Sequence, residues 1–126
     1  MNRTRSRYRA ALTHERREWY KIRNSTNPSD PAEILIYDEI GYGGWFYDGV
    51  TANSLVRQLE DITSDEIRVR INSPGGDVFE GIAILNALRA HPARVTTIVD
   101  GLAASAASFI AMAGDEIVIA RNAEMM

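Results

Sequence analysis

IRVRI-NSPGGD-VFEGIAILNALRA, residues 67–90, is the stretch that decides the fold. Its first five residues alternate between apolar and charged side chains, a period of two that predicts a half-buried strand. Its last thirteen residues carry apolar side chains at three- and four-residue steps, which predicts a helix from about Val78 to Ala90. Pro74, Gly75 and Gly76 predict a tight turn between the two. The stretch therefore indicates a strand, a turn and a helix.

The alternation of strands and helices continues on both sides of this stretch. Short β-branched runs predict strands, and amphipathic or small-residue runs predict helices. The expected strands cover 33–37, 95–99 and 116–120, and the expected helices cover 51–61, with Thr51 as N-cap, and 105–113. Strands joined by helices favour βαβ units, parallel pairing and right-handed crossovers. We therefore expect an α/β fold with a mostly parallel sheet.

Composition limits the classes of protein and of chemistry. The chain has 126 residues and 45% hydrophobic side chains, which is ordinary for one globular domain. It has no cysteine, so disulfide scaffolds, thiolate metal sites and cysteine nucleophiles are excluded. No apolar run reaches the roughly 18 residues of a membrane-spanning helix. No secretion signal is visible either, so we expect a cytoplasmic protein that does not contact a membrane.

Charge divides the chain unevenly. Residues 1–23 carry a net charge of +6 and the remaining 103 residues carry −9, within a total of −3. We interpret 1–23 as a basic N-terminal arm, 24–31 as a polar linker with two prolines, and 32–126 as the folded domain. Such an arm binds nucleic acid or an acidic partner surface, or it is a solvated tail.

The first candidate for chemistry is the turn at residues 72–77. Adjacent glycines allow a close approach to a ligand and aim N–H groups outward. The start of the following helix adds a positive dipole, which suits a developing anion. The turn therefore predicts an oxyanion hole or a phosphate-binding turn, and the alternative is a plain strand-to-helix turn. The Gly-Lys-Ser/Thr of a Walker loop is missing.

The second candidate is Ser105, between an expected strand and a small-residue helix. Its hydroxyl would lie beside free backbone N–H groups, as an acyl-transfer nucleophile requires; alternatively it caps the helix. In a parallel sheet both turns fall at the carboxyl ends of strands, where open α/β folds place their sites. We therefore expect Ser105 to face the turn at residues 72–77, with the N–H groups of Gly76 and Ala106 nearest to an oxyanion.

The two candidate turns contain sequence motifs that resemble those of a known family. Residues 71–76 (INSPGG), followed by GLAAS ending at Ser105, resemble the ClpP-type serine proteases, and more closely the ClpP-type head-maturation (prohead) proteases of tailed phages. Residues 34–40 and 111–116 extend the likeness. The resemblance implies a crotonase-like ββα superhelix, a ring-shaped homo-oligomer, and scaffold or capsid proteins as substrates in the host cytoplasm or the prohead.

The resemblance also implies roles for individual residues. Ser105 matches the nucleophile, and Ser108, one helical turn later, ranks well below it. The N–H groups of Gly76 and Ala106 match the oxyanion donors. The remaining residues of the turn are expected to shape the rim that binds an extended substrate: Asn72, Ser73, Pro74 and Gly75.

One departure from the family concerns the general base. In the family a histidine follows an Asn-Ala-x-Met-Met-like stretch, and a carboxylate comes later still; here that stretch is residues 122–126, the last five of the sequence. His14 lies in the arm and His91 at the far end of the 78–90 helix, where we expect a surface residue. Without a base a serine is a poor nucleophile, so we expect the C-terminally incomplete domain to have little activity alone. The alternative function is an inactive assembly module of a phage head or ring.

Two other enzyme classes fit the sequence less well. Enoyl-CoA hydratase relatives would need acids over an acyl group, and Asp77 and Glu80 are near the double glycine. A serine–lysine peptidase would need a lysine base, but the only lysine is Lys21 in the arm. Nothing resembles a metal-ligand cluster or a nucleotide loop, so no metal or cofactor is expected.

Overall fold

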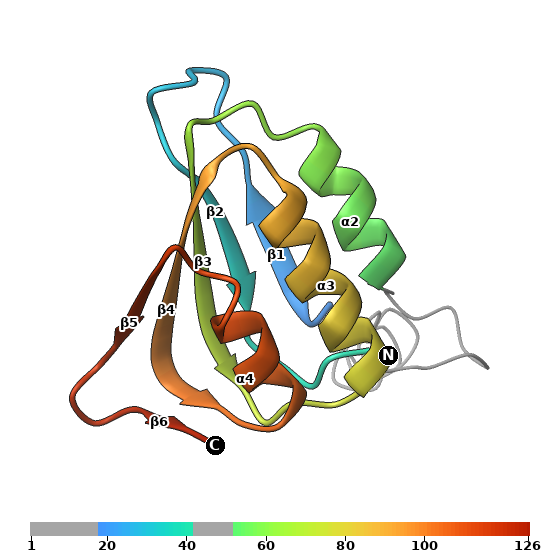
Figure 1. The fold of residues 1–126 in the computed structure, drawn as a ribbon, viewed down its shortest axis with the longest axis vertical. Coiled ribbons are helices and arrows are strands. Elements are labelled where there is room, and N and C mark those ends of the chain that lie inside the picture. Colours follow the sequence, from blue (N-terminus) through green and yellow to red (C-terminus); the bar gives the residue numbers. More distant parts are fainter. Residues whose placement is uncertain (1–17, 42–51) are drawn as a thin grey trace, which may run out of the picture.

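A computed structural model describes residues 18–41 and 52–126. The two termini of the described part lie at different strands of one sheet (Figure 1). The expected N-cap Thr51 lies outside the described residues. The elements in chain order are β1 (Tyr20–Arg23), β2 (Ala32–Ile36), α2 (Ala52–Glu60), β3 (Glu66–Ser73), α3 (Val78–Ala90), β4 (Arg94–Ala103), α4 (Ala106–Ala111), β5 (Glu116–Ile119) and β6 (Glu124–Met125).

The strands form one mixed sheet in the order β1-β2-β3-β4-β5, and β6 pairs with the far end of β4. From β2 to β5 every pair is parallel, whereas β1 is antiparallel to β2. The expected βαβ organisation and mostly parallel sheet are therefore confirmed. The parallel pairing places the carboxyl ends of β3 and β4 at one edge, together with the starts of α3 and α4 (Figure 1).

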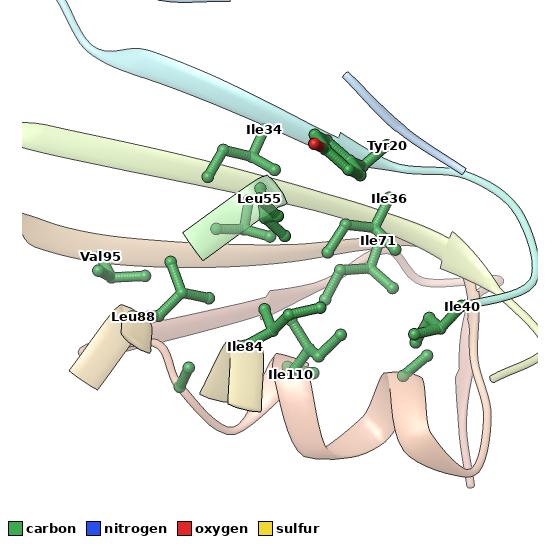
Figure 2. Close-up of a cluster of buried hydrophobic side chains, with 14 of the residues drawn as sticks. Tyr20, Ile34, Ile36, Ile40, Leu55, Ile71, Ile84, Leu88, Val95 and Ile110 are labelled. Atoms are coloured by element: carbon green, nitrogen blue, oxygen red, sulfur yellow. The ribbon is translucent and has the colours of Figure 1, made fainter. Parts of the chain in front are cut away.

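The two faces of the sheet differ in polarity. The helices lie on one face, and the strand residues on that face fill a continuous apolar core with residues of α2, α3 and α4 (Figure 2). The core includes Ile34, Ile71, Leu55, Ile84 and Ile110. The alternate strand residues, which are mostly charged, lie on the opposite face, and no described helix covers it. Because one face is buried and the other is exposed, apolar and charged residues alternate along residues 67–71.

The predicted N-terminal arm includes residues that belong to the folded domain. Residues 20–23, assigned to it, form strand β1, and Trp19 and Tyr20 are buried in the core. A four-residue edge strand with two basic side chains has a weak pattern, so pairing with β2 and burial of these aromatics stabilise it rather than propensity. The predicted linker 24–31 then connects β1 to β2 and does not separate an arm from the domain. The rest of the arm lies outside the described residues.

Two other predicted boundaries shift at the site. β4 was expected to end at residue 99 but continues to Ala103 through an irregular stretch. α4 was expected over 105–113 but spans Ala106–Ala111, because Ser105 has a φ of 52° and cannot be helical. The predicted α3 is confirmed at both ends. No described helix is long and apolar enough to span a membrane.

Candidate active site

The turn between β3 and α3 is held by its own side chains. The Ser73 hydroxyl donates to the Asp38 carbonyl at 2.6 Å and accepts the Gly75 N–H at 3.1 Å. Asp77 is the N-cap of α3 and accepts the Glu80 N–H at 3.0 Å. The backbone reverses through φ values of 100° at Gly75 and 145° at Gly76, which side-chain-bearing residues rarely adopt.

Gly76 lies directly against Ile40. The Ile40 N–H donates to the Gly75 carbonyl at 2.7 Å, and the Asp77 N–H donates to the Ile40 carbonyl at 3.1 Å. A Cβ on Gly76 would lie 2.2 Å from the Ile40 carbonyl oxygen, so only glycine fits here. The Gly76 N–H, between these two bonds, has no hydrogen-bond partner among residues 18–41 and 52–126.

The turn between β4 and α4 is organised differently. Ser105 is an exposed residue in an unusual conformation, φ 52° and ψ −125°, and its side chain makes no capping hydrogen bond. Ser105 therefore occupies the N-cap position of α4, but its side chain does not cap the helix. The N–H of Ala106, the first residue of α4, has no partner within the part of the chain that the structure describes. An exposed hydroxyl thus neighbours a backbone donor that is available to a ligand.

The structure brings the two turns into contact. A Cβ on Gly75 would lie 2.9 Å from the Ser105 Cβ and 3.1 Å from the Ala106 nitrogen. The expected juxtaposition of Ser105 with the glycine turn is therefore present, and Gly75 is the residue that allows it. Ser108 is placed apart from this arrangement, because its hydroxyl donates to the Ser105 carbonyl at 2.6 Å.

The expected substrate rim is only partly available to a ligand. Pro74 and Asn72 are exposed, and the Asn72 side chain accepts the Leu102 N–H at 3.2 Å. Ser73, however, is 1% exposed and its hydroxyl is used inside the turn. Ser73 therefore shapes the turn from within and does not line a rim.

The one histidine of the described part, His91, has a structural role at the other edge of the sheet. Its Nδ1 accepts the Ala93 N–H at 3.0 Å, which leaves Nε2 to donate to the Leu59 carbonyl at 3.0 Å. It is half-buried rather than a plain surface residue. The 13 residues of α3 separate it from the glycine turn by about 20 Å. His14 lies outside the described residues.

The two acids near the double glycine serve the ends of helices. Asp77 caps α3, and the Glu80 carboxylate accepts the Ala52 N–H at 3.0 Å, at the start of α2. Burial raises the pKa of Glu80, the Ala52 N–H opposes that rise, and the nearby Asp77 charge adds to it. Both carboxylates accept backbone N–H groups at the starts of helices, which argues against the hydratase alternative. No group of three or more His, Cys, Asp or Glu in the described ranges could hold a metal ion.

The sequence did not predict a polar cluster that links β3, β4 and the residue directly after β2. The cluster lies close to the site, on the face of the sheet without helices. Arg70 of β3 donates to both oxygens of Asp100 of β4, at 2.9 and 2.7 Å, and the Tyr37 hydroxyl donates to Asp100 at 2.5 Å. Burial raises the pKa of Asp100, but the hydrogen bonds from Arg70 and Tyr37 outweigh this and hold it below its usual value. The bond to Asp100 raises the pKa of Tyr37. The alternation in residues 67–71 put Arg70 on the polar face, but nothing in the sequence paired it with Asp100.

Strand β6 brings residues 124–126 beside the turn between β4 and α4. Its residues pair in parallel with Leu102 and Ala103, the Met126 N–H donates to the Ala103 carbonyl, and the Ser105 N–H donates to the Met126 carbonyl at 2.7 Å. The main chain of Ser105 is thus fixed on the side away from Gly75.

Both turns of the site lie within a match to one known protein family. The family model "Clp protease" matches residues 25–126. The chain belongs to the Clp protease family. The match includes both turns of the site and all described strands except β1.

Similar proteins carry the same family name. The chain is 41% identical over 86 residues to an ATP-dependent Clp protease proteolytic subunit of Deinococcus radiodurans, covering 65% of this chain and 42% of that protein. It is 39% identical over 84 residues to the corresponding subunit of Bacteroides fragilis, covering 64% and 41%. The chain thus spans about two fifths of the length of these curated Clp relatives.

Solved structures confirm the fold. ClpP1 from Listeria monocytogenes matches with a TM-score of 0.61 and 28% identity, over 73% of this chain and 53% of that one. The ClpP catalytic domain of Plasmodium falciparum matches with a TM-score of 0.53 and 37% identity, over 64% and 44%. The expected ClpP-type α/β fold with a mostly parallel sheet is therefore confirmed.

Proposed function

We propose that this chain supplies the nucleophile and the oxyanion hole of a ClpP-like serine endopeptidase that cleaves protein substrates. The Ser105 Oγ attacks the scissile carbonyl carbon and loses its proton to a general base. The carbonyl oxygen becomes an oxyanion that accepts hydrogen bonds from the N–H groups of Gly76 and Ala106. The observation that supports this most is the contact between an exposed, uncapped serine and a glycine turn, with one N–H on each side that is unpartnered among the described residues.

We further propose that the 126 residues alone have little peptidase activity. His91 uses both ring nitrogens in backbone hydrogen bonds at the other edge of the sheet, so it is not the base for Ser105. A serine protease without its base retains only the contribution of binding and of the oxyanion hole, several orders of magnitude below the full rate.

A fluorophosphonate probe tests both proposals. We expect slow labelling of the chain at a single site, identified as Ser105 by peptide mass spectrometry, and faster labelling when imidazole is added as an external base. Ser105→Ala should abolish labelling, whereas the control Ser108→Ala, one turn away, should retain it. Equal labelling of the chain and of Ser105→Ala would overturn the assignment of the nucleophile. Peptide hydrolysis by the chain alone at the rate of a complete Clp protease would overturn the proposal of low activity.

The finer proposal concerns the substrate class. The sequence resemblance to head-maturation proteases supports scaffold or capsid proteins as substrates, in the host cytoplasm or the prohead, whereas the relatives above are named as Clp proteolytic subunits. Introducing Ser105→Ala into the genome that carries the gene distinguishes the functions. Loss of head-protein processing supports the protease. Unchanged processing and assembly supports the alternative, an inactive assembly module.

Exposed apolar side chains support self-association, which we propose takes the form of a homo-oligomeric ring. Phe79 is 83% exposed, and Val78 and Ile82 beside it on α3 are also exposed. Phe109 on α4, which packs against α3, and Met112, directly after α4, are also exposed. We expect sedimentation velocity to show an oligomer that Phe79→Asp dissociates, with the surface substitution Arg57→Asp as control. A monomer at all concentrations would contradict self-association of the chain.

A further inference from the structure

Strand β4 contains an irregularity immediately before the nucleophile turn. Ile71 pairs with Val99, and the next paired residues are Ser73 and Ala103. Between these pairs β3 has Asn72 alone, whereas β4 has the segment 100–102. β4 therefore bulges, and the bulge determines where the chain enters the turn at Ser105.

The β3 side of the bulge is fastened by Asn72. Its side-chain oxygen accepts the Leu102 N–H at 3.2 Å. The same oxygen would lie 2.7 Å from a Cβ on Gly101, so the β4 backbone approaches Asn72 closely. This contact fixes the second half of the bulge but leaves Asp100, its first residue, to be held by other groups.

Asp100 is held by a residue of β3 and by the residue that follows β2. Arg70 binds both carboxylate oxygens in a two-pronged geometry, and Tyr37, directly after β2, donates to one of them. A planar guanidinium paired with a carboxylate in this way restricts orientation as well as distance. The Arg70 and Asp100 side chains are 37% and 20% exposed, which shields the pair from solvent more than the other ion pairs of the described residues.

The bulge ends at the active-site turns. After it, Ala103 pairs with Ser73, the Ala104 N–H donates to the Ser73 carbonyl at 3.1 Å, and Ser105 follows. A slip of β4 by one residue would move Ser105 by about 3.3 Å relative to the glycine turn. Oxyanion donors act within a range of a few tenths of an ångström, so the register of β4 decides whether the Gly76 and Ala106 N–H groups converge.

We propose that the cluster of Tyr37, Arg70 and Asp100 positions the nucleophile turn: it locks the bulge of β4 and thereby sets Ser105 and Ala106 against Gly75 and Gly76. The inference rests on the proposed peptidase site and adds three positioning residues to it. None of the three contacts Ser105 itself. They act through the backbone of residues 100–104, on the face of the sheet opposite the helices.

The test compares Asp100→Asn with the control Glu66→Gln. Both remove one carboxylate charge from an arginine pair on the same face, but the Arg68–Glu66 pair, at 3.4 Å, is at the other end of β3. With imidazole present, we expect Asp100→Asn to slow fluorophosphonate labelling of Ser105 by about 10- to 100-fold, since small misplacements of reacting groups have effects of this size. Glu66→Gln should stay within about 2-fold of the unchanged chain. Equal rates for the two variants would overturn the inference.

A second measurement does not depend on the peptidase proposal. Amide ¹H–¹⁵N shifts of Gly76 and Ala106 report the geometry of the turns even if Ser105 never reacts. We expect Asp100→Asn to shift both amides and Glu66→Gln to leave both in place; unshifted amides in Asp100→Asn would overturn the positioning role. If Asp100→Asn does not fold, Tyr37→Phe removes one hydroxyl and keeps the Arg70–Asp100 pair, and it should shift the same amides by less. Absence of labelling with amide shifts as expected would refute the peptidase proposal alone.

Discussion

The two turns that meet at the site use a serine in opposite ways. In the β3–α3 turn Ser73 is buried, and its hydroxyl links the Asp38 carbonyl to the Gly75 N–H. In the β4–α4 turn Ser105 is exposed, and its hydroxyl bonds to nothing in the described part of the chain. The first turn uses its serine hydroxyl internally, and the second leaves its serine hydroxyl available.

The backbones of the two turns also differ in where strain is placed. The first turn adopts positive φ values only at Gly75 and Gly76, where they cost little. The second adopts one at Ser105, the one non-glycine residue with positive φ among residues 18–41 and 52–126. Strain at a residue with no structural hydrogen bond from its side chain is typical of functional sites. The difference between the turns therefore supports the proposal that Ser105 is the nucleophile.

The largest effect should follow from giving Gly76 a side chain. Gly76→Ala would place a Cβ 2.2 Å from the Ile40 carbonyl oxygen at a φ of 145°, so the turn must open. We expect the free energy of unfolding, from urea titration, to fall by about 2–4 kcal/mol. Pro74→Ala, in the same turn but exposed, should cost less than about 1 kcal/mol. Similar losses in both variants would show that the Ile40 contact does not limit the turn.

The two serines allow a direct comparison of structural and reactive roles. Ser73→Ala removes the two hydrogen bonds that the buried Ser73 hydroxyl makes, and should lower the free energy of unfolding by about 1–3 kcal/mol. Ser105→Ala removes no hydrogen bond and should change it by less than about 0.5 kcal/mol. Chemical denaturation of both variants measures the contrast, which would be refuted if Ser105→Ala were the more destabilised.

The sequence alone predicted α3 and the contact between the two turns. The α3 helix was predicted at both ends, because apolar side chains recur at three- and four-residue steps over its whole length and the glycine turn precedes it. The contact of Ser105 with the glycine turn followed from parallel pairing alone, since that pairing puts the carboxyl ends of strands at one edge. Both predictions depend on local patterns or on one general rule of topology.

The features that the sequence did not predict depend on contacts between residues far apart in the chain. β1 is stabilised by pairing with β2 and by burial of Trp19, neither of which its short basic sequence reveals. The extension of β4 passes through Asp100-Gly101, a pair typical of turns, and tertiary bonds to Arg70 and Asn72 keep it in the sheet. Ser73 was expected at a substrate rim together with the rest of the turn, but the link that its hydroxyl makes between Asp38 and Gly75 places it inside.

The strain at Ser105 can be tested by relieving it. Ser105→Gly permits φ 52° and ψ −125° without a Cβ penalty. Glycine also raises the conformational entropy of the unfolded chain, which destabilises the fold, but the relief of strain should be the larger effect. We expect Ser105→Gly to be more stable than Ser105→Ala by about 1 kcal/mol, measured as a higher unfolding midpoint at an unchanged denaturant slope. Equal midpoints for glycine and alanine would mean that the observed backbone conformation is not strained.

The smallest effect concerns acid stability of the cluster next to the second turn. Because the pKa of Asp100 is lower in the folded chain than in the unfolded one, its charge stabilises the fold above the unfolded value of about 3.9. That contribution is lost as the pH falls from there through the folded value. We expect the unchanged chain to exceed Asp100→Asn in stability by about 0.5–1 kcal/mol at pH 6, the range of partly exposed ion pairs. The difference should vanish at the acid end of the titration.

Tyr37→Phe sharpens this last prediction. It removes one of the two donors that lower the pKa of Asp100 and leaves Arg70 in place. The pH at which the stabilisation disappears should therefore move upward, toward that of an ordinary aspartate, while the plateau near neutral pH falls only slightly. An unchanged midpoint would mean that Arg70 alone determines the ionisation of Asp100. Tyr37 would then position the bulge through its hydrogen bond without tuning the charge that holds it.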